Sequence, residues 1–138
     1  MLAPLIHELP PKTLVGKQQR MSLVHNQTAA LWQGFMQQRS QLAAINTLLY
    51  SLQLYDADYF TAFHPAKEFT KWALAEVQDV THVPNGFETF YLPGGLYAVF
   101  HHTGSDTNIF QEIFAQWLPQ SEYVLDNRPH FEVLGEKY

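Results

Sequence analysis

Two segments with helical periodicity, each lying between β-prone runs, constrain the fold of this chain most. The first presents one apolar face opposite several glutamines, and this face consists of Leu31, Trp32, Phe35 and Met36. The second repeats the pattern over residues 109–118 and is expected to end at Pro119, because proline cannot continue a helix. Asn26 or Thr28 could cap the first helix, and the polar residues 106–108 the second. The pattern predicts an α+β fold with one core-facing helix in each half.

The β-prone runs around these helices alternate apolar and polar residues. In 48–55, Tyr50, Leu52 and Leu54 alternate with Ser51 and Gln53, which is the period of a half-buried strand. Further strands are expected at 13–21, with a bulge at Gly16, and at 69–77, 87–92, 96–103 and 130–134. A helix is the competing interpretation of 69–77. The Pro93-Gly94-Gly95 sequence predicts a hairpin between 87–92 and 96–103.

The charge balance excludes some classes of partner. Eight basic residues against thirteen acidic ones give a net charge of −5, and no two basic residues are adjacent. A nucleic-acid site needs a clustered basic face, so no direct nucleic-acid binding is expected, and a cationic or neutral ligand is the easier partner. Only 15% of residues are charged, which favours a richly apolar interior or cavity.

The sequence also argues for a cytoplasmic protein without disulfides or a metal site. There is no cysteine, no signal-peptide pattern in the first eight residues, and no apolar run of membrane-spanning length. The seven histidines show no ligand spacing, so neither a metal nor another cofactor is expected. Gly94-Gly95 precedes a strand rather than a helix and is no phosphate loop.

Four stretches, taken in order and spacing, resemble a known family: 71–77 (KWALAEV), 92–100 (LPGGLYAVF), 117–119 (WLP) and 128–133 (RPHFEV). This is the effector-binding domain family found at the ends of AraC- and MerR-type transcription regulators. The family also occurs as single domains in GyrI-like, gyrase-inhibitory proteins and in stand-alone integron-associated effector-binding proteins. The resemblance covers the C-terminal half, whereas the N-terminal half agrees only in element order and in the aromatic 48–55 strand.

The resemblance implies a single effector-binding domain built from two pseudo-symmetric strand-helix-strand-strand modules. They would share a curved antiparallel sheet with two helices on one side and a ligand cavity where the modules meet. Residues 1–80 would form the first module and residues 81–138 the second. The family normally continues to a closing strand that this sequence lacks. The chain is therefore cut short, or residues beyond Tyr138 were not included, or another copy supplies the edge.

Glu132 is the acid that the resemblance singles out. It maps to the glutamate of the family's Phe-Glu-x-Tyr-like motif, the usual cation-facing acid, although Leu134 stands where tyrosine is common. Strand alternation alone would favour a solvent-facing carboxylate at this position. A buried carboxylate without a partner is costly, and an entering cation restores its charge partner. We therefore expect cation binding that weakens as the pH falls and Glu132 takes up a proton.

Aromatic residues on the other strands are candidates for the wall of the site. Trp72, Tyr50, Tyr97 and Phe100 could stack on a flat organic cation, with Glu76 as a second acid on the Trp72 face. The competing interpretation is that these aromatic residues belong to the core and that Glu76 is only the polar end of its strand. Trp117 is expected in the core.

Together these observations predict a stand-alone protein that binds a small, lipophilic, cationic, drug-like effector and has no catalytic residues. The sequence contains no DNA-binding helix-turn-helix, so a role in transcription control would need a partner regulator, and a homodimer is a further expectation. Two alternatives stay open. One is a hydrolase of the same fold that uses Glu132 as its base, and the other is a protein-interaction module of the gyrase-inhibitory kind.

Overall fold

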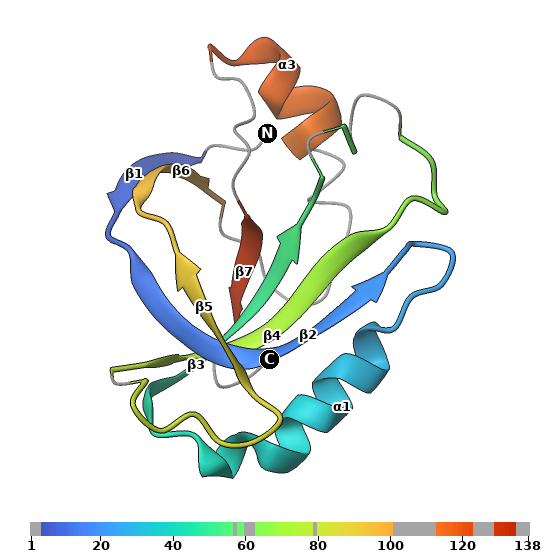
Figure 1. Ribbon diagram of the computed structural model, residues 1–138. Coiled ribbons are helices and arrows are strands. Elements are labelled where there is room, and N and C mark those ends of the chain that lie inside the picture. The colour runs from blue at the N-terminus through green and yellow to red at the C-terminus, as the bar shows by residue number, and fades with distance from the viewer. Residues whose placement is uncertain are drawn as a thin grey trace. The chain divides into compact units, whose positions relative to one another are not determined.

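The computed structural model describes residues 4–56, 58–59, 63–78, 80–100, 113–122 and 129–134 (Figure 1). The chain forms two compact units, each made of two segments. The larger contains Lys12–Pro93 and Asn127–Tyr138, and the smaller contains Met1–Pro11 and Gly94–Asp126.

A five-stranded antiparallel sheet forms the larger unit, with the strand order β5-β2-β4-β3-β7. The strands are β2 (Lys12–Met21), β3 (Ala44–Leu54), β4 (Phe69–Val77), β5 (Glu88–Leu92) and β7 (His130–Leu134). Their positions confirm the strands expected from the alternation, including a strand rather than a helix over 69–77. β3 begins earlier than expected, and its pairing with β4 is irregular between Ala44 and Leu49.

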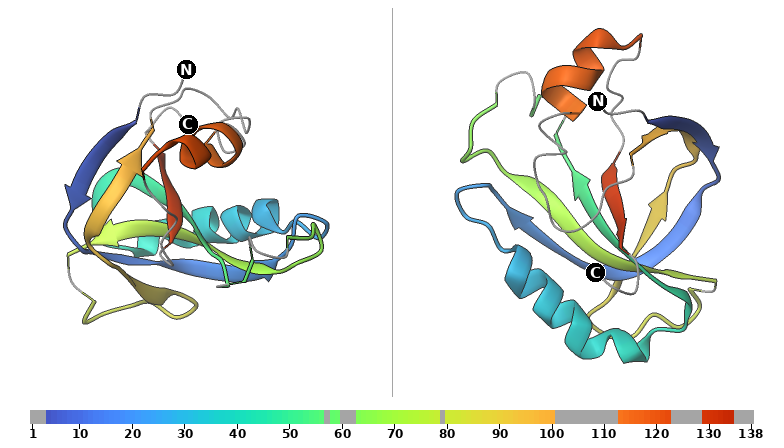
Figure 2. Two further views of the ribbon diagram at one scale, coloured as in Figure 1. Left: turned by 90° about the horizontal axis from the view of Figure 1, so that it is seen from above. Right: turned by 180° about the vertical axis from the view of Figure 1, so that it is seen from behind.

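Helix α1 (Thr28–Gln38) packs against one face of this sheet, where it contacts β2 and β4 (Figure 2). It begins where expected, but its N-cap is Gln27, which makes no side-chain cap hydrogen bond, so the predicted caps Asn26 and Thr28 are wrong. The side-chain oxygen of Asn26 instead accepts a local hydrogen bond from the backbone N–H of Thr28 at 2.9 Å. Leu31 and Phe35 are the buried residues of the helix, on the side that faces the sheet. Met36 was predicted on the same face, but it lies at the margin of the apolar stripe and is 46% exposed. A 3-10 turn, η1 (Arg39–Gln41), follows the helix.

The sheet is apolar on both faces. On the face covered by α1, strand residues such as Val15, Ala73 and Ala75 pack with Leu31 and Phe35. We call the opposite side the aromatic face. Its buried residues are Leu14, Tyr50, Leu52, Trp72, Leu74 and Leu92, and its partly buried ones are Leu48, Leu54, Phe90 and Phe131.

Gly16 is needed for the close approach of β2 to β4. A Cβ at this position would collide with the carbonyl oxygen of Ala73. The bulge expected at Gly16 is absent, since β2 pairs with β4 in unbroken register from Leu14 to Met21. The glycine therefore allows the close contact of the two strands and does not mark a bulge.

In the smaller unit, β1 (Leu5–Leu9) pairs with β6 (Gly95–Val99) as a two-stranded antiparallel sheet. The hairpin predicted between 87–92 and 96–103 is wrong, because β5 pairs with β2 and β6 pairs with β1. A two-residue hairpin turn of the usual kinds requires a positive φ at its first central residue, and Pro93 cannot adopt one. β1 was not expected, and the predicted continuation over residues 101–103 lies outside the described residues.

The second helix is described only from Ile113. A wide π-type turn (Ile113–Trp117) leads into α3 (Leu118–Gln120). The predicted caps at 106–108 and the residues up to 112 lie outside the described part. The helix passes the expected stop at Pro119, because this proline falls in the first turn of α3, where its missing N–H is tolerated.

The α+β class is confirmed, with the strands divided between two antiparallel sheets. The order β2-α1-β3-β4 in the larger unit is the predicted strand, helix, strand, strand order. The division into modules 1–80 and 81–138 stays a prediction.

Candidate ligand-binding site

The pairing of the strands decides which predicted site residues share a face. Trp72 lies opposite Leu52, and Leu74 lies opposite Tyr50, in the register of β3 and β4. Side chains two residues apart on a strand project to the same side. Trp72 and Tyr50 therefore lie on the aromatic face, together with Glu76, which follows Leu74 by two residues on β4.

Two aromatic residues that were not predicted complete this face. The ring of Phe90 lies 5.2 Å from the ring of Trp72, and the ring of Phe131 lies 6.1 Å from that of Tyr50, centroid to centroid. Both added rings are only partly buried. The alternation of β5 and β7 could have identified them once the register of these strands was known.

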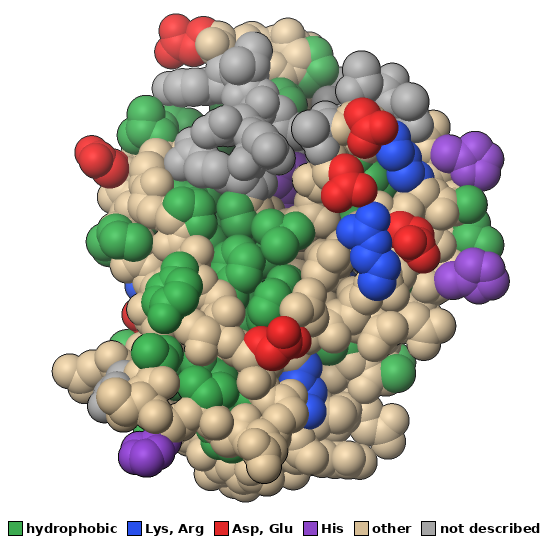
Figure 3. Space-filling model, viewed as in Figure 1, with side chains coloured by type: hydrophobic (Ala, Val, Ile, Leu, Met, Phe, Trp, Pro, Cys, Tyr) green, Lys and Arg blue, Asp and Glu red, His purple; other side chains and the backbone are tan. Residues whose placement is uncertain are grey.

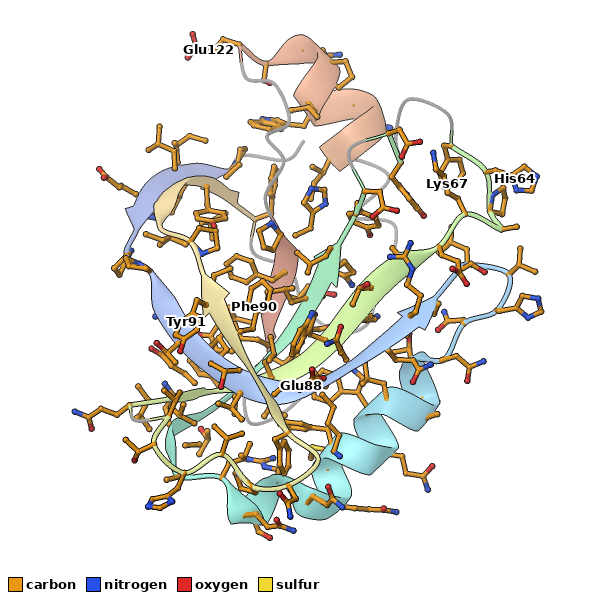
Figure 4. The ribbon with its side chains drawn as sticks, viewed as in Figure 1. His64, Lys67, Glu88, Phe90, Tyr91 and Glu122 are labelled. Carbon is orange, nitrogen blue, oxygen red and sulfur yellow. The ribbon has the colours of Figure 1, made fainter. Side chains whose placement is uncertain are left out.

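Figure 4 shows how the strand pleat separates Phe90 from its neighbour Tyr91, which points away and is 66% exposed. In Figure 3, hydrophobic side chains gather over β3, β5 and β7. This apolar surface belongs to the larger unit and contains the candidate site.

Trp72 has a buried donor for which the described residues offer no acceptor. The side chain is 5% exposed. Its indole Nε1 has no hydrogen-bond partner among the residues that the structure describes. A buried polar group in this condition is uncommon in folded proteins.

Glu76 is the acid beside Tyr50 on the aromatic face, and Glu88, two residues before Phe90 on β5, is a second acid on the same side of the sheet. The Oε1 of Glu76 lies 3.5 Å from the ammonium of Lys12 and accepts a long hydrogen bond of 3.4 Å from the hydroxyl of Tyr50. Burial and, to a lesser extent, the Glu76 carboxylate raise the pKa of Tyr50 to about 12, so this hydroxyl stays a donor at neutral pH. Both contacts reach the same oxygen, and within the described residues Oε2 has no hydrogen bond. The Glu76 side chain is 16% exposed.

Glu132 projects to the opposite face of the sheet. It pairs with Ser51 across β3 and β7, whereas the neighbouring Phe131 pairs with Leu52 and packs on the aromatic face. Glu132 therefore shares the α1 side with Lys71. Burial lowers the pKa of the Lys71 ammonium, and the nearby Glu132 carboxylate partly offsets this effect. The structure does not bring Glu132 together with Trp72, Tyr50 and Glu76.

The two remaining candidates, Tyr97 and Phe100, belong to the smaller unit. Tyr97 lies on β6 opposite His7, and the ring of Phe100 meets that of Trp117 edge-on at 5.2 Å. Trp117 is half-buried.

An open depression of about 500 Å³ also lies in the smaller unit, lined by Glu8, Leu9, Pro10, Pro11, Gly94 and Gly95. None of these six residues is aromatic. We therefore judge it a poorer site for a flat organic ligand than the aromatic face, because it offers no ring to stack on.

In the described part of the chain, no group of three histidine or acidic side chains is placed to hold a metal ion. None of the helices described is long and apolar enough to cross a membrane.

The fold resembles that of a solved integron cassette protein. The crystal structure of VCH_CASS2, from the mobile metagenome of Vibrio cholerae, matches with a TM-score of 0.69 over 94% of this chain and 86% of that chain. The two sequences are 15% identical, so this likeness shows the fold alone. The sequence itself matches the Cass2 family, described as integron-associated effector binding protein, over residues 5–138. The chain therefore belongs to this family, which confirms the predicted resemblance. A comparison with curated proteins finds no match.

Proposed function

We propose that this protein binds a small hydrophobic cation on the aromatic face, with Glu76 as the acid that selects the positive charge. The observation that carries the proposal is the placement of Glu76, whose side chain is 16% exposed, beside the buried apolar and aromatic residues of this face. Glu88 of β5, a second acid on this side of the sheet, is exposed and already accepts a hydrogen bond from Gln18. The family name, which describes effector binding, supports a binding role in general.

The chemistry of the face favours cations over anions. Each aromatic ring that meets a cation contributes roughly 0.5 to 2 kcal/mol, more when the contact excludes water. The open Oε2 of Glu76 offers a charge partner, and the net charge of −5 favours the approach of cations. An anion would meet the Glu76 carboxylate without gaining a new donor other than Trp72.

Effector binding also implies a receiver of the signal. We propose that the loaded protein acts through a partner chain, either a second copy or a transcription regulator. The coarse support is the family name, which associates these proteins with integrons and effectors.

The binding role predicted for Glu132 stays a prediction. Its place beside Lys71, away from Trp72, supports a different role as the counter-ion of a partly buried ammonium. The same binding experiment separates the two acids, because each can be changed alone to the neutral isostere glutamine.

The experiment measures the affinity of an arylbutyl-trimethylammonium ion and of its neutral analogue, in which a tert-butyl group replaces the charged head. Isothermal titration gives both dissociation constants, and thermal shift confirms binding to the native state. We expect the wild type to bind the cation more tightly than the neutral analogue. In Glu76→Gln the ratio of the two affinities should fall about tenfold, since a hydrogen-bonded charge is removed. Glu132→Gln is the matched control and should keep it.

Two results would contradict the proposal. Equal affinity for the cation and the neutral analogue would show that charge is not selected. Loss of the preference in Glu132→Gln, but not in Glu76→Gln, would assign the acid to the other face.

A further inference from the structure

The side chain of Trp72 has one polar atom, the indole nitrogen, and none of the described residues accepts a hydrogen bond from it. Its neighbours on the aromatic face include the ring of Phe90, the side chain of Leu52 on β3 and that of Gln18 on β2. The first two are apolar, and the amide of Gln18 donates to the Glu88 carboxylate. Within the described residues, folding therefore removes the indole donor from water without replacing the lost bond.

Trp72 and Glu76 lie at the two ends of a row of three side chains on β4. Every second residue of β4 projects to the same face, and on the aromatic face these include Trp72, Leu74 and Glu76. Leu74, between the other two, is completely buried. Four residues of extended strand place the α carbons of Trp72 and Glu76 about 13 Å apart. A ligand that spans the row meets a carboxylate at one end and a hydrogen-bond donor at the other.

We infer that the ligand of the aromatic face carries a neutral hydrogen-bond acceptor, such as a ketone or ether oxygen, that binds the indole Nε1 of Trp72 while its cationic centre lies at Glu76. This inference rests on the proposed function and specifies the class of ligand. An anionic acceptor is disfavoured, because Glu76 lies on the same face and the chain is acidic overall.

Phe90 contacts Trp72 from the edge of the sheet. Its ring contacts the indole from β5, which ends the strand order of the five-stranded sheet, and it is only partly buried. Trp72, on the central strand β4, is held by neighbouring strands on both sides. Of these two rings, Phe90 can therefore move at the lower cost when a ligand binds beside Trp72.

The test uses two cations that differ only in the para substituent of the ring. The first is para-acetylphenyl-butyl-trimethylammonium, whose ketone can accept a hydrogen bond, and the second carries a para-isopropyl group of similar shape. Their dissociation constants are measured by isothermal titration for the wild type, Trp72→Phe and Trp32→Phe. Trp32, on α1, serves as the control because it packs on the other face of the sheet.

The quantity of interest is the change in the ratio of the two dissociation constants from the wild type to each variant, since this comparison removes the difference in hydrophobicity between the probes. We expect Trp72→Phe to shift this ratio against the ketone by about five- to tenfold, as expected for one lost hydrogen bond, and Trp32→Phe to leave it unchanged. An unchanged ratio in Trp72→Phe, with both cations still bound, overturns the inference and leaves the proposed function intact. Failure of the wild type to bind either cation overturns both.

A second measurement needs no folded variant. The chain has three tryptophans, so the wild type gives three indole N–H signals in a proton–nitrogen correlation spectrum. One of them should move downfield with the ketone and not with the isopropyl probe. Binding of the ketone without such a difference would contradict a hydrogen bond to Trp72.

Discussion

Substituting alanine for Gly16 tests the closest strand contact of the sheet. A Cβ at Gly16 would overlap the carbonyl oxygen and carbon of Ala73 and approach the α carbon of Leu74. All three atoms are backbone, so no side chain can turn aside, and β2 would have to move away from β4. Both strands pair with two neighbours in the sheet, and a local shift would disturb those pairings as well.

The expected cost exceeds that of ordinary overpacking, which is about 1 to 3 kcal/mol. We expect Gly16→Ala to lower the free energy of unfolding by at least about 3 kcal/mol. For a domain of this size, that corresponds to a fall in melting temperature of roughly 10 °C. Chemical denaturation gives the free energy directly, and circular dichroism gives the melting temperature.

Gly34 provides the matched control for this substitution. It lies inside α1, and nothing stands within 4 Å of a Cβ built there. Gly34→Ala should stabilise the protein by about 0.5 to 1 kcal/mol, because alanine loses less freedom than glycine in a helix. If Gly16→Ala were as stable as the wild type, β2 and β4 could not approach as described, and the register of the aromatic face would need revision.

Three further outcomes are expected. Lys12→Met, which removes the ammonium from Glu76 Oε1, should raise the affinity for a quaternary ammonium probe a few-fold, and unchanged or weaker binding would speak against competition at this carboxylate. Phe35→Ala should cost about 3 to 5 kcal/mol in chemical denaturation, because Phe35 is fully buried and touches Trp32 and Phe87 edge-on; a loss below about 1 kcal/mol would contradict this packing. Burial lowers the pKa of His130, so the unfolded chain takes up its proton first, and stability should fall as the pH drops below about 6.5. The fall should be smaller in His130→Gln, measured by denaturation across mildly acidic pH, and an identical slope in both proteins would refute the assignment.

The elements of the larger unit could be predicted because their signals are local. Alternation over 48–55 and the apolar stripe of Leu31 and Phe35 each arise within a few residues, and both elements formed there, although β3 begins earlier, at Ala44. β1 escaped detection because its five residues lack regular alternation, and its partner β6 lies about 90 residues away along the chain. The wrong hairpin prediction could have been avoided from the sequence, because the fixed φ of Pro93 excludes the two-residue hairpin turn.

The candidate site could be predicted only in part. The sequence indicates that Trp72 and Glu76 share a side of β4, because they are four residues apart. It does not indicate which side of β7 meets which side of β4. That choice depends on the pairing of Ser51 with Glu132, and a shift of one residue would exchange Phe131 and Glu132 between the faces. The face of Glu132 is therefore a property of long-range pairing.

The burial of β4 on both faces limits where members of such a family can diversify. Ala73 and Leu74, neighbours on this strand, are both fully buried on opposite sides. A substitution there disturbs one core or the other, whichever side it faces. Phe90 and Phe131, on the outermost strands β5 and β7, are only partly buried and can change at lower cost. A change of ligand preference through Phe90 or Phe131 is therefore expected to cost less folding stability than one through the buried residues of the middle strand.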